Sequence, residues 1–226
     1  MNRDGAMPSR PAIGNSGLSQ TARYKHGMSS ITHQERAALD MAADAPMLAQ
    51  IEDWAGVNSG TGNLAGLRIV SEKLADAFAA LPGDIRLIEP EPVEAVLSDG
   101  TVAEIQRGRH LHLAVRPDAP KRVLLTGHMD TVFAADHPFQ SLRWLETGVL
   151  NGPGTADMKG GISVILAALN ALEGSPLASQ LGYDVLINSD EETGSHASAS
   201  LIKELARGKL AAFTYEPALP DGTLAG

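Results

Sequence analysis

Residues 123–130 read V-L-L-T-G-H-M-D, an apolar run that ends in a histidine and an aspartate. A short apolar run closed by glycine predicts a buried β-strand, on which alternate side chains share a face. His128 and Asp130 are therefore expected to point the same way at the C-terminal end of this strand. In open α/β sheets that edge carries the functional groups, because the connecting loops are free to hold polar side chains. A histidine beside a carboxylate suits a metal site, although the pair alone also fits a simple turn.

The composition is that of a globular protein, with 226 residues, 43% hydrophobic and 20% charged, which suits one or two domains. The net charge of −9 argues against a nucleic-acid or anionic-membrane partner. Since the chain has no cysteine, any metal must be held by His, Asp and Glu. No apolar run approaches the roughly 20 residues of a membrane span, and the N-terminus lacks the apolar core of a secretory signal, so the expected location is the cytoplasm.

Residues 1–33 are rich in Gly, Ser, Pro and Asn and show no apolar periodicity, which predicts a disordered N-terminal extension. Met28 opens M-S-S-I-T-H-Q-E-R and is an alternative start of the chain. Residues 34–226 are expected to form the folded part. It begins with apolar residues at helical spacing, which predict helices over residues 34–54, interrupted at Pro46, and over residues 64–81.

Short segments bounded by turn residues come next and predict antiparallel strands at one edge of a sheet: residues 85–90, 93–97, 101–105 and 110–115. Asp99-Gly100 between apolar flanks predicts a hairpin. His110 and His112 share one face of their strand and could form a metal pair. Because no acidic partner accompanies them in the sequence, we interpret them as the polar outward face of that strand.

The rest of the folded part alternates strands with helices, with strands expected at residues 123–128, 183–188 and 211–217 and helices at residues 162–172 and 197–207. This order predicts an α/β fold with a mostly parallel mixed sheet and helices on both faces. The C-terminal ends of the strands are then neighbours. An acidic side chain or a histidine lies at the C-terminal end of each of these strands or in the segment that follows it.

The glycine-rich stretch G-P-G-T-A-D-M-K-G-G, residues 152–161, places Asp157 at the entry to a helix. Asp157 replaces the third glycine of the pattern G-x-G-x-x-G, which disfavours a dinucleotide site. The stretch S-D-E-E-T-G-S follows another strand, where Ser189-x-x-Glu192 also fits a helix capping box. Glu216 before Pro217 fits a solvated strand end. Taken together, however, these groups suit zinc, manganese or cobalt, and one carboxylate can bridge two metals.

The motifs G-H-M-D-T-V, G-P-G-T-A-D-M-K-G-G, S-D-E-E-T-G-S and Y-E-P resemble, in this order, those of the co-catalytic zinc metallopeptidases. That family includes glutamate carboxypeptidase, acetylornithine deacetylase, succinyl-diaminopimelate desuccinylase and aminoacylase. The resemblance covers about residues 50–226, and N-S-G-T-G-N-L-A-G is most similar to the glutamate carboxypeptidase branch. It implies a zinc-exopeptidase-like catalytic domain with two Zn²⁺, or Co²⁺ or Mn²⁺. The implied roles are metal binding by His128 and Glu216 at one ion and Glu192 at the other, bridging by Asp157, orientation of His128 by Asp130, and general-base catalysis by Glu191.

The resemblance implies hydrolysis of the amide bond of a small peptide or N-acyl amino acid that has a free carboxylate. The family's α+β lid domain, through which it dimerises, and its last histidine ligand have no counterpart before Gly226. We therefore expect this chain to be the N-terminal part of the catalytic domain, to bind one metal better than two and to have little activity. His137 and His196 are expected to be solvated. The alternatives are a non-catalytic metal-binding remnant of such an enzyme and a nucleotide-binding α/β domain.

Overall fold

The computed structural model describes residues 31–219 and residue 223. Most of the predicted disordered extension, residues 1–33, and the alternative start Met28 lie outside the described residues. The end of that segment is helical, because α1 (His33–Ala43) starts at His33. The hydroxyl of Thr32 accepts from the Glu35 backbone N–H while the Glu35 carboxylate accepts from the Thr32 backbone N–H, which fixes this helix start.

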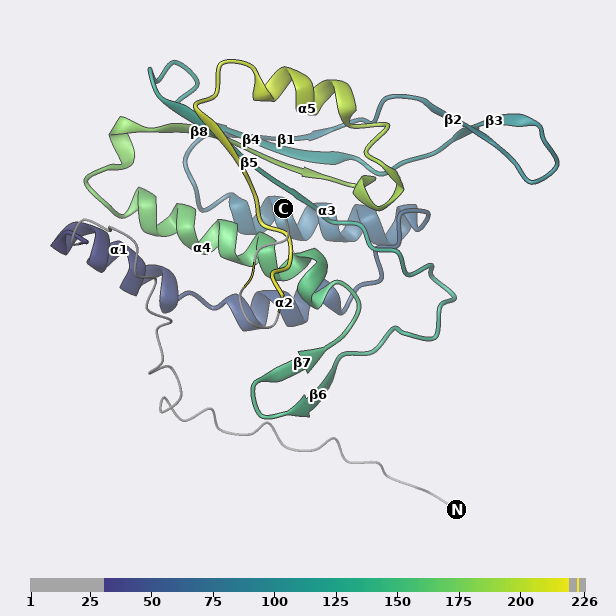
Figure 1. Ribbon diagram of the computed structural model, residues 1–226, viewed down its shortest axis with the longest axis horizontal. Coiled ribbons are helices and arrows are strands. Elements are labelled where there is room, and N and C mark those ends of the chain that lie inside the picture. Colours follow the sequence, from purple (N-terminus) through teal and green to yellow (C-terminus); the bar gives the residue numbers. More distant parts are fainter. Residues whose placement is uncertain (1–30, 220–222, 224–226) are drawn as a thin grey trace.

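A five-stranded mixed sheet in the order β1-β4-β8-β5-β9 forms the centre of the fold (Figure 1). Its strands are β1 (Asp84–Ile88), β4 (His110–Val115), β8 (Gly182–Asn188), β5 (Arg122–His128) and β9 (Ala211–Thr214). Strand β5 pairs in parallel with β8 and with β9, whereas β4 pairs antiparallel with β8 and with β1. The predicted mixed α/β sheet is confirmed. The C-terminal ends of β8, β5 and β9 meet at one edge.

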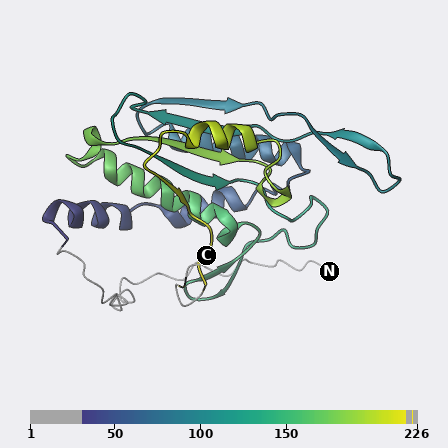
Figure 2. The same ribbon diagram turned by 45° about the horizontal axis from the view of Figure 1, so that its top comes forward.

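Helices cover both faces of this sheet (Figure 2). On one face lie α3 (Leu64–Phe78) and α4 (Gly161–Glu173), with α1 and α2 (Met47–Ala55) packed against α4, and on the other lies α5 (Ala199–Ala206). The α3 and α4 side chains that enter the core are Leu67, Val70, Leu74, Phe78, Ile162, Ile165, Leu166 and Leu169. Each such burial contributes roughly 1.5–3 kcal/mol relative to an exposed side chain. This packing fixes α4, and therefore the loop that enters it, against β5.

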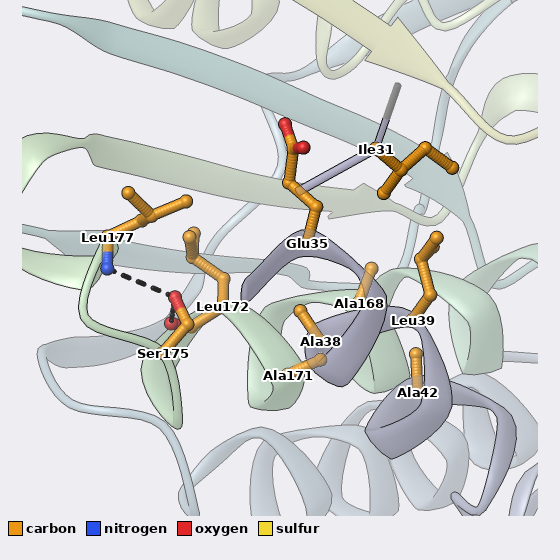
Figure 3. A pocket seen from close by; sticks show the side chains of 10 residues that line it. All are labelled: Ile31, Glu35, Ala38, Leu39, Ala42, Ala168, Ala171, Leu172, Ser175 and Leu177. Carbon is orange, nitrogen blue, oxygen red and sulfur yellow. Dashed lines mark hydrogen bonds between the residues drawn. The ribbon is translucent and has the colours of Figure 1, made fainter. Parts of the chain in front are cut away.

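An apolar groove runs along the contact between α1 and the C-terminal half of α4 (Figure 3). Its walls are Ala38, Leu39 and Ala42 on one side and Ala168, Ala171 and Leu172 on the other. The strand ends of the parallel part of the sheet lie instead beside the N-terminal end of α4. The groove is therefore separate from the polar cluster described below.

The structure corrects the position of the predicted hairpin and contains a second one. The hairpin of β2 (Val93–Val96) and β3 (Val102–Ile105) exists, but these strands pair only with each other and project away from the main sheet, so their placement at its edge was wrong. Val96 and Val102 at its tip are 72% and 62% exposed, so no core holds them to the sheet. The region between residues 131 and 151, for which the sequence indicated no strand, contains a second hairpin, β6 (Arg143–Glu146) and β7 (Val149–Asn151).

None of the helices in the described ranges combines the length and the apolar character that a bilayer crossing requires.

Candidate metal centre

The first group of the site comes from the end of β5, where His128 and Asp130 are both buried. His128 Nδ1 lies 3.0 Å from the backbone oxygen of Asp130 and 3.4 Å from its Oδ1. A proton on Nδ1 is therefore donated to Asp130, which leaves Nε2 as the atom that faces the other acids. This arrangement fixes the ring orientation and the tautomer that a metal ligand needs.

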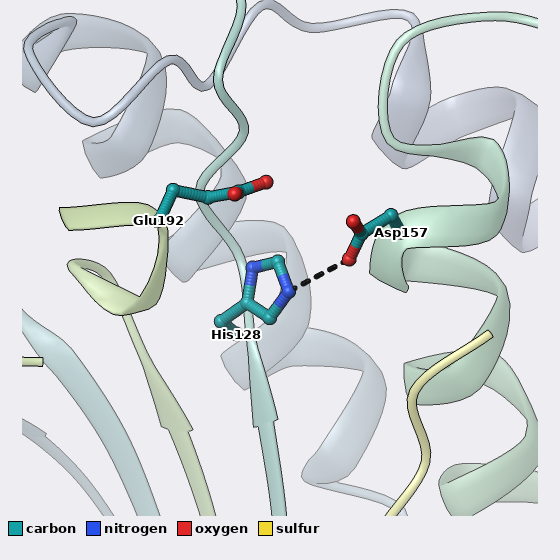
Figure 4. Close-up of side chains that lie close together, drawn as sticks. All are labelled: His128, Asp157 and Glu192. Atoms are coloured by element: carbon teal, nitrogen blue, oxygen red, sulfur yellow. Dashed lines mark hydrogen bonds and ion pairs between the residues drawn. The ribbon is translucent and has the colours of Figure 1, made fainter. Parts of the chain in front are cut away.

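Two further acids approach His128 from separate turns (Figure 4). Asp157 lies in the irregular helical turn η1 (Thr155–Gly160), and its Oδ1 is 3.0 Å from His128 Nε2. Glu192 lies in the short turn η3 (Glu191–Thr193) that follows β8. One ligand atom from each of His128, Asp157 and Glu192 falls within 4.8 Å of the other two. The structure thus brings together three of the predicted metal ligands.

The fourth predicted ligand and the predicted base lie beside the same ring nitrogen. Glu216, just after β9, has Oε1 3.7 Å from His128 Nε2, and Glu191 has Oε2 3.9 Å from it. The ring of His128 is 1% exposed, whereas the side chains of Asp157, Glu191 and Glu216 are about half exposed. A buried imidazole therefore presents one edge to carboxylates that solvent can reach.

The crowding of acids around one imidazole shifts the pKa values of the cluster. Burial disfavours the charged form of His128, but the carboxylates of Asp130, Glu216 and Asp157 outweigh it and raise the pKa of His128 to about 9. Burial and the nearby Asp157 raise the pKa of Glu192, and burial also raises that of Glu216. A proton on His128 supplies the positive charge that the surrounding carboxylates favour.

Asp130 also orders the turn that carries Glu191 and Glu192. Its carboxylate accepts hydrogen bonds from the backbone N–H groups of both residues, each at 3.2 Å. The hydroxyl of Thr61, from the loop before α3, donates to Asp130 Oδ2 at 2.7 Å. Thr61 was missed in the sequence, because an isolated threonine in a glycine-rich loop carries no signal of a partner so far along the chain.

The capping box that the spacing of Ser189 and Glu192 would allow does not form. The hydroxyl of Ser189 donates instead to the backbone oxygen of Gly108 at 2.6 Å, and η3 has no side-chain cap. Asp190, the first acid of the motif, points away from the cluster. It accepts from the Ala197 N–H and the Ser198 hydroxyl, both at 2.7 Å, and so shapes the loop before α5.

Among the described residues, the other histidines are not part of the candidate metal group. His137 and His196 are exposed, as expected. His110 and His112 do not form a simple outward face: His110 is buried, and Nε2 of His112 lies 2.8 Å from Oδ1 of Asp184. The sequence showed no acidic partner for His112 because Asp184 lies on β8, the neighbouring strand.

The donor set fits a divalent metal of the zinc, manganese or cobalt type. It offers one imidazole nitrogen and several carboxylate oxygens, has no thiolate, and holds the imidazole through its second nitrogen. The exposed carboxylates leave room for further ligands. These features define the class: an α/β domain with a histidine–carboxylate group suited to metal at the C-terminal edge of its sheet.

Comparison with known proteins agrees with this class. Residues 124–225 match Peptidase family M20/M25/M40, so this part of the chain carries a domain of the M20 type. It is 31% identical over 171 residues to carboxypeptidase G2 of Pseudomonas sp. (strain RS-16), a match that covers 74% of this chain and 37% of that protein. It is 34% identical over 136 residues to acetylornithine deacetylase of Vibrio vulnificus (strain CMCP6), covering 57% of this chain and 30% of that protein.

The crystal structure of human carnosine dipeptidase 1 has the same fold, with a TM-score of 0.62 at 18% identity over 83% of this chain and 42% of that chain. The family match and the two sequence relatives confirm the family resemblance read from the motifs, and the dipeptidase structure supports the fold alone. The chain spans less than half the length of each of these relatives.

Proposed function

We propose that this domain belongs to a hydrolase that cleaves the amide bond of a small peptide or an N-acyl amino acid with a free carboxylate. The observation that carries the proposal is the convergence of His128, Asp157 and Glu192 within 4.8 Å beside the half-exposed Glu191. The names of the relatives, a carboxypeptidase and an acetylornithine deacetylase, support a substrate of this class.

The residues that would hold metal divide into two sets. His128, Asp157 and Glu216 would bind one ion, and Asp157 together with Glu192 would bind a second, with Zn²⁺ as the expected metal and Co²⁺ or Mn²⁺ as substitutes. A bound ion supplies a Lewis acid for the carbonyl of the scissile amide. Since the second set offers two residues among those described, we expect this chain to bind one ion more tightly than a second and to have low activity by itself.

Glu191 is the proposed general base. Its carboxylate faces the cluster, 3.9 Å from His128 Nε2, and is open to solvent. It would take a proton from the attacking water and return it to the nitrogen of the leaving amine, a transfer that contributes typically about 10²–10⁴ to such rates. Asp130 is a positioning residue, because it orients the imidazole of His128 and the backbone of Glu191.

The zinc content of the purified chain, measured by elemental analysis, tests the proposal. We expect about one zinc per chain, lost in His128→Ala and retained in His137→Ala, which removes an exposed histidine outside the cluster. Thermal unfolding of the metal-free samples shows whether each variant is folded. Absence of zinc from a cooperatively folded wild-type chain, or zinc retained at full content in His128→Ala, would contradict the assignment.

A further inference from the structure

A buried lysine lies directly behind the candidate metal centre and takes no part in the proposed reaction. Lys159 follows Asp157 in η1, and its side chain is 1% exposed. Its Nζ donates to the hydroxyl of Ser59 at 2.8 Å and to the backbone oxygen of Val57 at 3.4 Å. Because a buried ammonium is costly unless it is hydrogen-bonded, these contacts hold the lysine in one place.

Ser59 carries this contact on to the strand that bears the histidine. Its hydroxyl, fully buried, donates to the backbone oxygen of Met129 at 2.7 Å. Met129 stands between His128 and Asp130. The chain of hydrogen bonds from Lys159 through Ser59 to Met129 therefore joins the turn that carries Asp157 to the strand end that carries His128.

The loop that contains Ser59 is itself fixed to the same strand end. The backbone N–H of Thr131 donates to Ser59 O at 3.0 Å, and the N–H of Thr61 donates to Thr131 O at 3.2 Å. Gly60 and Thr131 form an isolated parallel bridge. Ser59 is thus a rigid anchor for the ammonium group of Lys159.

We propose that Lys159 and Ser59 are positioning residues that set the separation between Asp157 and His128 before a metal binds. This inference rests on the proposed metal site. The acids of the cluster repel one another, and the Asp157 side chain is about half exposed, so little packing restrains it. The hydrogen bonds from Lys159 through Ser59 to Met129 keep the two ligands close. They thereby reduce the conformational entropy that is lost when a metal binds.

The test compares zinc affinity in Lys159→Met and Ser59→Ala with the wild type, by competition with a chromogenic zinc chelator. Outer hydrogen-bond partners of metal ligands typically change metal affinity by about 10- to 100-fold, and we expect a loss of this size in each variant. If the two residues act through one chain, Lys159→Met/Ser59→Ala binds zinc about as weakly as the weaker single variant.

Ser71→Ala is the matched control. Ser71 is also buried, but its hydroxyl donates to the Arg68 backbone oxygen within α3. It should change the melting temperature of the metal-free protein without changing zinc affinity, which separates general destabilisation from positioning. If Lys159→Met does not fold, Ser59→Ala, which removes a single oxygen atom, decides the question.

The outcomes separate the two proposals. A folded wild-type chain without zinc affinity overturns the proposed metal site. The positioning role would be overturned if the wild type binds zinc and Ser59→Ala binds it with unchanged affinity, or with a loss of affinity no larger than that of Ser71→Ala. It would also be overturned if the fold-losses of zinc affinity in the two single variants multiply in the double variant. Each of these results leaves the proposed metal site intact.

Discussion

The Nε2 atom of His128 lies 3.0 Å from Oδ1 of Asp157, although the residues are 29 positions apart and the β6–β7 hairpin intervenes. One partner is a buried ring on a central strand and the other a half-exposed carboxylate at the entry to α4. The contact shows how the fold assembles the cluster: rigid elements bring groups from different loops to one point.

Zinc binding is expected to release a proton. Because the pKa of His128 is raised to about 9, the ring carries a proton at pH 7 that a metal ion must displace. Apparent zinc affinity should therefore rise by about tenfold per pH unit as the pH increases from 6 towards 8, and level off near the pKa of the ring.

Isothermal titration calorimetry at pH 7, in buffers of different ionisation enthalpy, measures this release directly. We expect about one proton per zinc ion. An observed binding enthalpy that does not depend on the buffer would show that His128 is neutral in the metal-free protein or is not a ligand.

Glu191 and Glu192 are adjacent and chemically identical, yet they should respond differently to the same substitution. Glu192 has a ligand atom within 4.8 Å of those of His128 and Asp157, so Glu192→Gln should weaken zinc binding by about tenfold or more. Glu191→Gln should leave zinc affinity close to wild type and lower any hydrolysis of an N-acyl amino acid by about 10²–10⁴. Chelator competition and an amine-release assay give both readouts. Equal loss of zinc in the two variants would reject the separate roles.

The candidate site was predictable as far as its groups follow from strand order. Parallel pairing of β5 with β8 and β9 places His128, the acids after Asn188 and Glu216 at one edge, which the alternation of strands and helices already indicated. The residues that hold the site in place through hydrogen bonds were not predictable from the sequence. Ser59 and Thr61 act on residues about 70 positions away, and the polar loop that holds them has no periodicity that could reveal a partner.

In two places, tertiary contacts overrode the structure that the local sequence pattern indicated. Ser189 had the spacing of a helix cap, but its hydroxyl found the Gly108 carbonyl of a distant loop. The β2–β3 hairpin followed its turn sequence correctly, whereas its position depended on whether any core would cover Val96 and Val102, and none does among the described residues. The local sequence determines whether a turn or a strand forms, whereas the apolar surface available for burial determines where that element packs.

The ionic cluster on the α5 side of the fold should limit stability in acid. Burial raises the pKa of Asp184, but hydrogen bonds from His112 and Lys209 outweigh it and hold the pKa below the usual value. The carboxylate therefore stabilises the fold above its unfolded pKa of about 3.9, and this contribution is lost as the pH falls through the lower, folded-state pKa. Asp184→Asn should cost roughly 3–5 kcal/mol at pH 7, because it leaves the buried Lys209 unpaired.

Urea unfolding of wild type and Asp184→Asn between pH 7 and pH 3 measures this contribution. The difference in free energy of unfolding should be constant down to about pH 5 and shrink below pH 4. A difference that stays the same across the whole range would mean that the charge of Asp184 is not what stabilises the native state.

Gly161 links the glycine motif to the position of Glu216. A Cβ atom at Gly161 would lie 2.0 Å from the backbone oxygen of Tyr215, so Gly161→Ala forces the segment before Glu216 away from α4. The glycine has ordinary helical dihedral angles, and helix propensity alone would favour alanine by about 1 kcal/mol. We expect steric overlap to dominate, with destabilisation of about 1–3 kcal/mol.

Zinc affinity should also fall in Gly161→Ala, because Glu216 is withdrawn from His128. Gly62→Ala, where a Cβ meets nothing within 4 Å, should leave zinc affinity unchanged. A more stable Gly161→Ala protein with wild-type zinc affinity would show that Glu216 does not depend on this contact.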